Sequence, residues 1–205
     1  MLMKKFVFCY LFIGLLVLFM LVSTSSAVST SSTVTEYGAF PFVGPVISQG
    51  EHDNWCAFAC FEMLIAAKGI TPYKAMCEIA SLHVRLFYYQ ICDCCDNKVY
   101  SSGGPCVAGL KRTNIPTLAS QVGLRGMYYW IGIPAALTNA SPENVDLPKM
   151  ALVNRDSTHA IVVYYIVKMM EDDWHGEILV YYIDPQGGMA WVDRGGDSIF
   201  IDGTI

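Results

Sequence analysis

The longest hydrophobic segment of the chain lies at its N-terminus. Residues 6–22 form an almost unbroken apolar run that follows Lys4 and Lys5, and small residues come after it at positions 25–27. A basic start, an apolar middle and a small-residue end are typical of a secretory signal peptide. We therefore expect residues 1–27 to be a signal peptide and the protein to be secreted or extracytoplasmic. The run is about as long as the shortest membrane-spanning helices, so an uncleaved N-terminal membrane anchor is the alternative.

Apolar residues with helical spacing predict helices in the first half of the remaining chain. Residues 54–68 are rich in Ala, Met, Leu and Glu, and either Asp53 or Asn54 can cap the start of a helix there. This segment is apolar on nearly every side, which predicts a buried central helix. A second helix is expected over residues 72–87 and a short third one over residues 117–122.

The second half of the chain changes to β-branched and aromatic residues, which favour strands. Residues 160–167 and 178–183 are such runs, and the charged segment between them predicts an antiparallel hairpin. Residues 150–153 and 189–192 predict further strands. Helices that come first and a sheet that follows indicate an α+β fold, in which an N-terminal helical part packs on a C-terminal antiparallel sheet.

A polar segment separates the leader from this folded part. Residues 28–35 consist largely of Ser, Thr and Val without a packing pattern, and the residues up to position 45 add Gly and Pro. We expect residues 28–45 to form a flexible or extended N-terminal segment. Residues 46–205 contain no internal repeat and no boundary, so they are expected to form one domain.

Composition and charge narrow the classes of function. Hydrophobic residues make up 54% of the 205 residues and charged residues 15%, which excludes a disordered protein. Removing residues 1–27 takes away two lysines and no acidic residue, so the net charge changes from −5 to −7. An acidic chain without a basic cluster is a poor candidate for binding nucleic acid. Contact with a membrane is expected only if the N-terminal segment stays uncleaved.

The cysteine count becomes odd when the leader is removed. Eight cysteines fall to seven with the loss of Cys9, and secretion places the others where disulfides persist. At least one thiol then lacks an intramolecular partner. Cys56 is the candidate nucleophile, because it lies in the first turn of the expected central helix, where the helix dipole favours a thiolate. A buried disulfide half or an inert core thiol is the structural alternative.

A nucleophilic cysteine needs a base, a group that orients the base, and donors for the oxyanion. His159 directly precedes a predicted strand, at a sheet edge where its side chain can point into a cleft, whereas His83 is expected to be packed on a helix. Asp184 ends the partner strand, so the predicted hairpin makes it a neighbour of His159. Gln49 precedes Cys56 by a short loop, and its amide together with the Cys56 backbone N–H can supply two oxyanion donors. A turn-starting Asp-Pro is the alternative for Asp184.

In this order, these residues resemble the papain-like cysteine peptidases. The matching segments are Gln49, Asn54-Trp55-Cys56-Ala57-Phe58-Ala59, Thr158-His159-Ala160-Ile161-Val162-Val163 and Ile183-Asp184-Pro185. The branch that they resemble contains bacteriocin-processing peptidase domains and plant-pathogen effector proteases. The resemblance implies a papain-like fold in which Cys56 is the nucleophile, His159 the base, Asp184 the orienter and Gln49 the oxyanion donor.

The sequence departs from the family pattern directly after the nucleophile. Ala57 and Phe58 stand where the family usually has Trp and Ala, which alters the wall beside Cys56. The expected function is hydrolysis of peptide bonds in a peptide or protein substrate through a Cys-His-Asp triad, with no cofactor and no metal. The alternative is a catalytically altered papain-like homologue that binds peptides or transfers acyl groups. A third hypothesis is a structural protein held together by disulfides.

Six further cysteines are expected to form disulfides: Cys60, Cys77, Cys92, Cys94, Cys95 and Cys106. Six cysteines permit fifteen pairings, and the sequence does not choose among them. Adjacent Cys94 and Cys95 are expected to take separate partners, and Cys60 can reach Cys77 on the next helix. Cys94-Cys95 with Cys106 is also similar to a paired cysteine segment of the family. A zinc site at Cys92, Cys94, Cys95 and Cys106 is the weaker alternative, because their spacing lacks paired C-x2-C units.

Overall fold

A computed structural model describes residues 32–96, 104–124, 130–138, 142, 145–153, 159–170, 176–196 and 199–202. The expected signal peptide, Cys9 and Thr158 lie outside the described residues. Within those ranges, no helix has the length and apolar character needed to cross a membrane.

The helices and strands follow one another along the chain in the order expected for an α+β fold. They are β1 (Thr33–Gly38), α2 (Cys56–Ala67), α3 (Met76–Tyr88), the 3-10 turns η1 (Pro105–Val107) and η2 (Arg112–Asn114), α5 (Ile115–Gln121), β2 (Trp130–Gly132), α6 (Ile133–Ala136), β3 (Lys149–Val153), β4 (Ala160–Met170), β5 (Gly176–Asp184), β6 (Met189–Arg194) and β7 (Ile199–Asp202). The expected helices and strands are all present among them, and the α+β fold class is confirmed.

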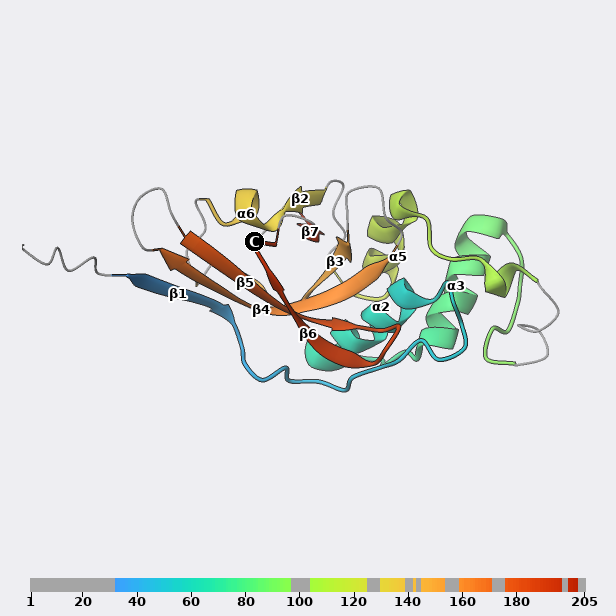
Figure 1. The fold of residues 1–205 in the computed structure, drawn as a ribbon. Helices are drawn as coiled ribbons and strands as arrows, with labels where there is room; N and C mark the ends of the chain where they lie inside the picture. The colour runs from blue at the N-terminus through green and yellow to red at the C-terminus, as the bar shows by residue number, and fades with distance from the viewer. Residues whose placement is uncertain are drawn as a thin grey trace, which may run out of the picture. The chain divides into compact units, whose positions relative to one another are not determined.

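One antiparallel sheet organises the described part of the chain (Figure 1). Its strand order is β2-β7-β3-β4-β5-β6, and β1 pairs with β4 beside this path. The expected hairpin is confirmed: β4 and β5 pair from Val162 opposite Ile183 to Met170 opposite Gly176. Since antiparallel pairing puts the start of β4 beside the end of β5, the residue before β4 and the last residue of β5 meet at the same end of the sheet.

Strand β4 is buried on both faces, which explains why its sequence is apolar without alternation. Ala160 and Val162 belong to the core cluster that includes α2, whereas Ile161 and Val163 belong to a second cluster with α6 and β7. The register shifts between Val163 and Tyr165. A β-bulge of this kind changes which face a following side chain occupies.

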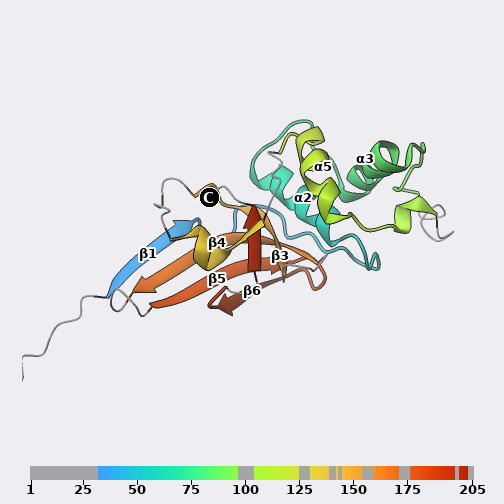
Figure 2. The same cartoon turned by 90° about the horizontal axis from the view of Figure 1, so that it is seen from above.

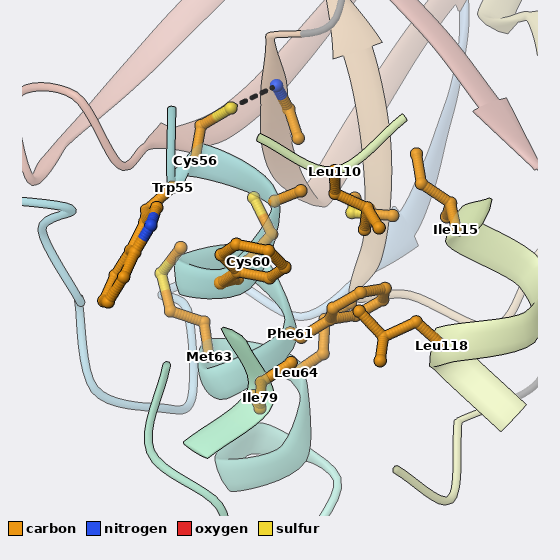
Figure 3. Close-up of a cluster of buried hydrophobic side chains, with 14 of the residues drawn as sticks. Trp55, Cys56, Cys60, Phe61, Met63, Leu64, Ile79, Leu110, Ile115 and Leu118 are labelled. Carbon is orange, nitrogen blue, oxygen red and sulfur yellow. Dashed lines mark hydrogen bonds between the residues drawn. The ribbon is translucent and has the colours of Figure 1, made fainter. Parts of the chain in front are cut away.

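Helix α2 lies against α3 on one side and against β3 and β4 on the other (Figure 2). Nearly all its residues are buried, from Cys56 through Ile65, as the apolar sequence predicts. Figure 3 shows the side chains of Phe61, Met63 and Leu64 gathered with residues of α3 and α5 in the core around this helix. The packing fixes the start of α2 relative to the sheet end.

Two element boundaries differ from the sequence analysis. Residues 33–38, expected to be flexible or extended, are an extended strand: β1 pairs with β4 from Thr33 opposite Met170 to Gly38 opposite Tyr165, and Tyr37 is 2% exposed. Helix α3 begins at Met76, later than the expected position 72. The Glu78 side chain accepts the N–H of Ala75 at 2.8 Å, and this cap sets the start of the helix.

The disulfides differ in part from expectation. Cys77 bonds Cys95 and Cys94 bonds Cys106, so the adjacent pair does take separate partners. Cys60 does not reach Cys77: it is a free thiol in the core, as Cys92 is at a half-buried position. Disulfides persist in oxidising compartments, and these two are compatible with such an environment.

Candidate active site

Cys56 is the first residue of α2, at the end of the helix where the dipole is positive. Neither Asp53 nor Asn54 caps this helix, contrary to expectation: the N-cap position is Trp55, which makes no side-chain capping bond. The Cys56 side chain is 7% exposed and forms no disulfide. The first-turn N–H groups of a helix have no intrahelical acceptors, so they can donate to a group placed at this position.

His159 and Asp184 meet at the end of the β4–β5 hairpin. Nε2 of His159 lies 3.1 Å from Oδ1 of Asp184, and the two side chains are 29% and 24% exposed. The same carboxylate oxygen accepts the N–H of Gln186 at 2.8 Å, which holds the Asp184 side chain within its turn. The carboxylate therefore fixes the orientation of the imidazole and leaves Nδ1 as the ring nitrogen for another partner.

That other partner is Cys56. The pKa of His159 is raised from 6.5 to about 9, first because its side chain hydrogen-bonds Cys56 and then because Asp184 bonds and attracts the imidazolium, while burial acts in the opposite direction. The imidazolium is thus the dominant form of His159 at neutral pH. The structure brings Cys56, His159 and Asp184 into one chain of contacts.

A backbone group adds to the environment of the sulfur. The N–H of Ala160 donates to Sγ of Cys56 at 3.4 Å, the contact drawn as a dashed line in Figure 3. This bond joins the first residue of α2 to the first residue of β4. A peptide N–H aimed at sulfur stabilises negative charge there, as the helix end does.

Gln49 lies beside the turn that follows Asp184. Its side chain is 4% exposed, and its backbone N–H donates to the carbonyl of Pro185 at 2.9 Å. Its Oε1 is buried and meets no hydrogen-bond donor within the described residues. Gln49 is therefore close to the Asp184 turn, although it is not among the residues that line the cleft in front of Cys56.

A cleft of about 250 Å³ opens at Cys56 and His159. The segment after η1 contributes Gly109, Leu110 and Lys111 to its wall, and Asp53 and Asn54 also line it. The amide of Asn54 donates to the carbonyl of Val107 at 3.3 Å. A Cβ at Gly109 would come within 3.1 Å of the Asn54 carbonyl oxygen, so the wall and the loop before Cys56 are in close contact.

Trp55 connects the start of α2 to the segment that carries Cys106. Its side chain is 1% exposed, and its indole Nε1–H donates to the carbonyl of Cys106 at 2.8 Å. His52 stacks on the indole with ring centroids 4.0 Å apart. The residue immediately before the candidate nucleophile is thereby held by the peptide of a disulfide-bonded cysteine.

The two departures from the family pattern occupy different places. Ala57 lines the cleft beside Cys56. Phe58 is completely buried and packs edge-on against Trp55 with ring centroids 5.9 Å apart, so it belongs to the core and not to the wall beside Cys56. Only the Ala57 position therefore changes the space next to the sulfur, where a small side chain leaves room.

Sequence reasoning did not find the Ala160 N–H or the carbonyls of Cys106 and Val107. These are backbone groups, which every residue carries, so no residue type marks them. The cleft wall at Gly109 and Lys111 was also missed, because it comes from a segment without a motif and is placed by tertiary contacts.

Three cysteine sulfurs lie close together among the described residues. The sulfurs of Cys92, Cys94 and Cys106 all lie within 4.8 Å of one another. Two of these sulfurs are joined to each other in a disulfide, which leaves Cys92 as the thiol of the group. The group lies apart from the residues that line the cleft at Cys56.

No protein-family model, no curated protein and no solved structure matches this chain.

Proposed function

We propose that this protein is a papain-like cysteine peptidase that is secreted and that hydrolyses peptide bonds through Cys56, His159 and Asp184. The observation that carries the proposal is the position of His159, whose side chain bonds Cys56 and, through Nε2, Asp184 at 3.1 Å. A nucleophile, a base and a group that orients the base are the parts that acyl transfer by cysteine requires.

In the proposed reaction, the Cys56 thiolate attacks the carbonyl carbon of a peptide bond in the cleft. The carbonyl oxygen takes the negative charge, and N–H groups at the start of α2 offer donors at this point. The His159 imidazolium then gives its proton to the departing amine, and the C–N bond breaks to leave a thioester on Cys56. Water, deprotonated by His159, attacks the thioester and releases the acid and the thiolate.

Asp184 keeps the imidazole in the orientation and tautomer that this proton transfer needs. Its Oδ1 accepts hydrogen bonds from Nε2–H of His159 and from the backbone N–H of Gln186, so the turn after β5 fixes the carboxylate. In this proposal Gln49 is the oxyanion donor. Its position beside the Asp184-Pro185 turn, with a 4% exposed side chain, supports this role.

The contact with His159 distinguishes Cys56 from Cys60, a second buried cysteine of α2 that forms no disulfide. Cys60 is one turn further along α2 and is completely buried, and burial first, then the negative charges of Cys56 and Asp184, raises the pKa of its thiol well above the ordinary value. Cys60 therefore stays protonated and unreactive. It provides a control of the same residue type on the same helix.

The test combines an electrophilic probe with a cleavage assay. Purified protein is treated with a peptidyl chloromethyl ketone, and the modified residue is located by mass spectrometry. Incubation with a pool of unfolded proteins then shows whether new N-termini appear. We expect one adduct at Cys56 and cleavage that Cys56→Ala and His159→Ala abolish but Cys60→Ala retains.

Cleavage that survives Cys56→Ala would overturn the peptidase proposal. An adduct at Cys56 without any cleavage, with transfer of the acyl group to an added amine, would favour the acyl transferase. Peptide binding without an adduct would favour a catalytically altered homologue, for which the small Ala57 side chain in the cleft is the relevant departure.

A further inference from the structure

Cys92 forms no disulfide but lies next to one, away from Cys56. Sγ of Cys92 is 3.5 Å from Sγ of Cys106, which is bonded to Cys94. All three sulfurs lie within 4.8 Å of one another. Cys106 therefore has two sulfurs within reach, although it can bond only one of them.

The two sulfurs that compete for Cys106 differ in exposure. Cys94 is 3% exposed and Cys106 1%, so solvent does not reach the bridge between them. Cys92 is half-buried and lines a surface cavity of about 400 Å³, together with Lys74, Arg85 and Ile91. A thiol or disulfide in solution can thus meet Cys92 but not the bridge behind it.

We propose that Cys92 is a thiol–disulfide exchange site that relays between this surface cavity and the buried Cys94–Cys106 bridge. The Cys92 thiolate bonds Cys106 Sγ, the Cys94–Cys106 bond breaks, and its electron pair leaves on Cys94, which takes up the proton that Cys92 lost. The number of disulfides and thiols is unchanged, so the step needs no oxidant or reductant.

The Cys92 side chain has room to move, whereas the backbone of Cys94 is held in place. Exchange proceeds by attack along the line of the bond that breaks, and the mutual distances below 4.8 Å show that the three sulfurs are not collinear. The Cys92 side chain must therefore rotate. It follows Ile91, which is 99% exposed, whereas the N–H of Cys94 is held by the Ser81 hydroxyl at 2.8 Å.

The exchange has a consequence for access to the bridge. A Cys92–Cys106 disulfide would have one sulfur at the surface cavity, where a small thiol can reduce it. Both sulfurs of the Cys94–Cys106 disulfide belong to buried residues. Since the carbonyl of Cys106 holds the Trp55 indole, the partner of Cys106 also affects the residue that precedes Cys56. This last link bears on the proposed peptidase, but the exchange itself does not depend on it.

Disulfide mapping of the folded protein tests the exchange directly. The protein is held at pH values below and above the ordinary pKa of a thiol and quenched with acid to stop exchange. It is then unfolded in urea, labelled with N-ethylmaleimide and digested without reduction. A protease that cleaves before Asp93 separates Cys92 from Cys94. We expect two populations above that pKa: Cys92 labelled with Cys94–Cys106 bonded, and Cys94 labelled with Cys92–Cys106 bonded. Detection of only the first at every pH would overturn the proposal.

Two variants make the result decisive. Cys94→Ser, treated with oxidised glutathione as the oxidant, should contain a Cys92–Cys106 disulfide, and labelling of both thiols in the folded, oxidant-treated variant would overturn the proposal. Cys92→Ser should keep the Cys94–Cys106 bridge and slow its reduction by dithiothreitol at least about tenfold, because the relay is gone. Cys60→Ala should reduce at the wild-type rate. Equal rates in all three proteins would overturn the relay, and this measurement stands even if Cys94→Ser does not fold.

Discussion

Oδ1 of Asp184 lies 3.1 Å from Nε2 of His159 and carries the interaction that orients the imidazole towards Cys56. The turn after β5 supports this oxygen, since the N–H of Gln186 donates to it at 2.8 Å. The charge of the Asp184 carboxylate and its hydrogen bonds therefore contribute separately to the pKa and the orientation of His159, and two substitutions can distinguish them.

We predict that Asp184→Asn lowers the pKa of His159 and reduces cleavage by about tenfold, because an amide oxygen can still accept both hydrogen bonds but carries no charge. Asp184→Ala removes the acceptor as well and should cost about a hundredfold or more. Rates measured across the pH range show both effects, and the alkaline limit should move to lower pH in Asp184→Asn. Equal losses in the two variants would contradict a separate role for charge.

The raised pKa of His159 also predicts a change of stability with pH. Hydrogen bonding to Cys56, and then to Asp184, raises this pKa from 6.5 to about 9, so the folded protein holds a proton that the unfolded chain releases. The resulting stabilisation is complete below pH 6.5 and is lost as the pH rises through about 9. Urea unfolding on both sides of this window measures it.

Two substitutions serve as controls for that window. Cys56→Ala removes the largest cause of the raised pKa and should narrow the window, and His159→Gln should remove the contribution of this group altogether. An unchanged pH dependence in His159→Gln would assign the effect to another group.

The sequence was sufficient for the elements whose pattern is local. Helix α2 has apolar residues on all sides, and β4 and β5 are long β-branched and aromatic runs, so their types follow from residue preferences. Strand β1 was missed because a Ser/Thr/Val segment on the sheet has most side chains exposed and only Tyr37 buried, which leaves no alternation to detect. Strands β2 and β7 are too short to produce a pattern.

The candidate site also contains residues that the sequence predicts and groups that only the folded structure places. Cys56, His159 and Asp184 could be proposed from the sequence because each lies at the end of a predicted element, and antiparallel pairing determines which ends meet. The pairing of the cysteines could not, because it depends on distances between loops. The Cys106 carbonyl and the Ala160 N–H could not either, since only the folded backbone places them beside Trp55 and Cys56.

The burial of His83 should make the folded protein less stable in acid. It is 1% exposed, it packs against the rings of Phe58, Phe87 and Tyr88, and neither ring nitrogen has a hydrogen-bond partner within the described residues. Burial lowers its pKa from 6.5 to about 4, so the unfolded chain takes up a proton first as the pH falls. Stability should therefore decrease from pH 6.5 down to about 4.

We predict that His83→Phe removes this acid-dependent loss and stabilises the protein at neutral pH by about 1 kcal/mol, because an apolar ring leaves no buried polar nitrogen unpaired. Urea unfolding between neutral and acidic pH measures both effects. His159→Gln is the matched histidine control and should keep the acid-dependent loss. A destabilised His83→Phe with the same pH profile as the wild type would show that a polar partner outside the described residues satisfies the imidazole.

Trp55 joins the start of α2 to the segment that carries Cys106. Trp55→Phe keeps an aromatic ring but removes the N–H that donates to the Cys106 carbonyl at 2.8 Å, and Cys106 is 1% exposed. A buried carbonyl that loses its donor costs about 1–3 kcal/mol of unfolding free energy. Trp191→Phe is the control at a 48% exposed position and should change stability by less than about 0.5 kcal/mol. Urea unfolding of both variants measures the difference. Similar small changes in the two would mean that the indole bond does not hold the Cys106 segment to the helix.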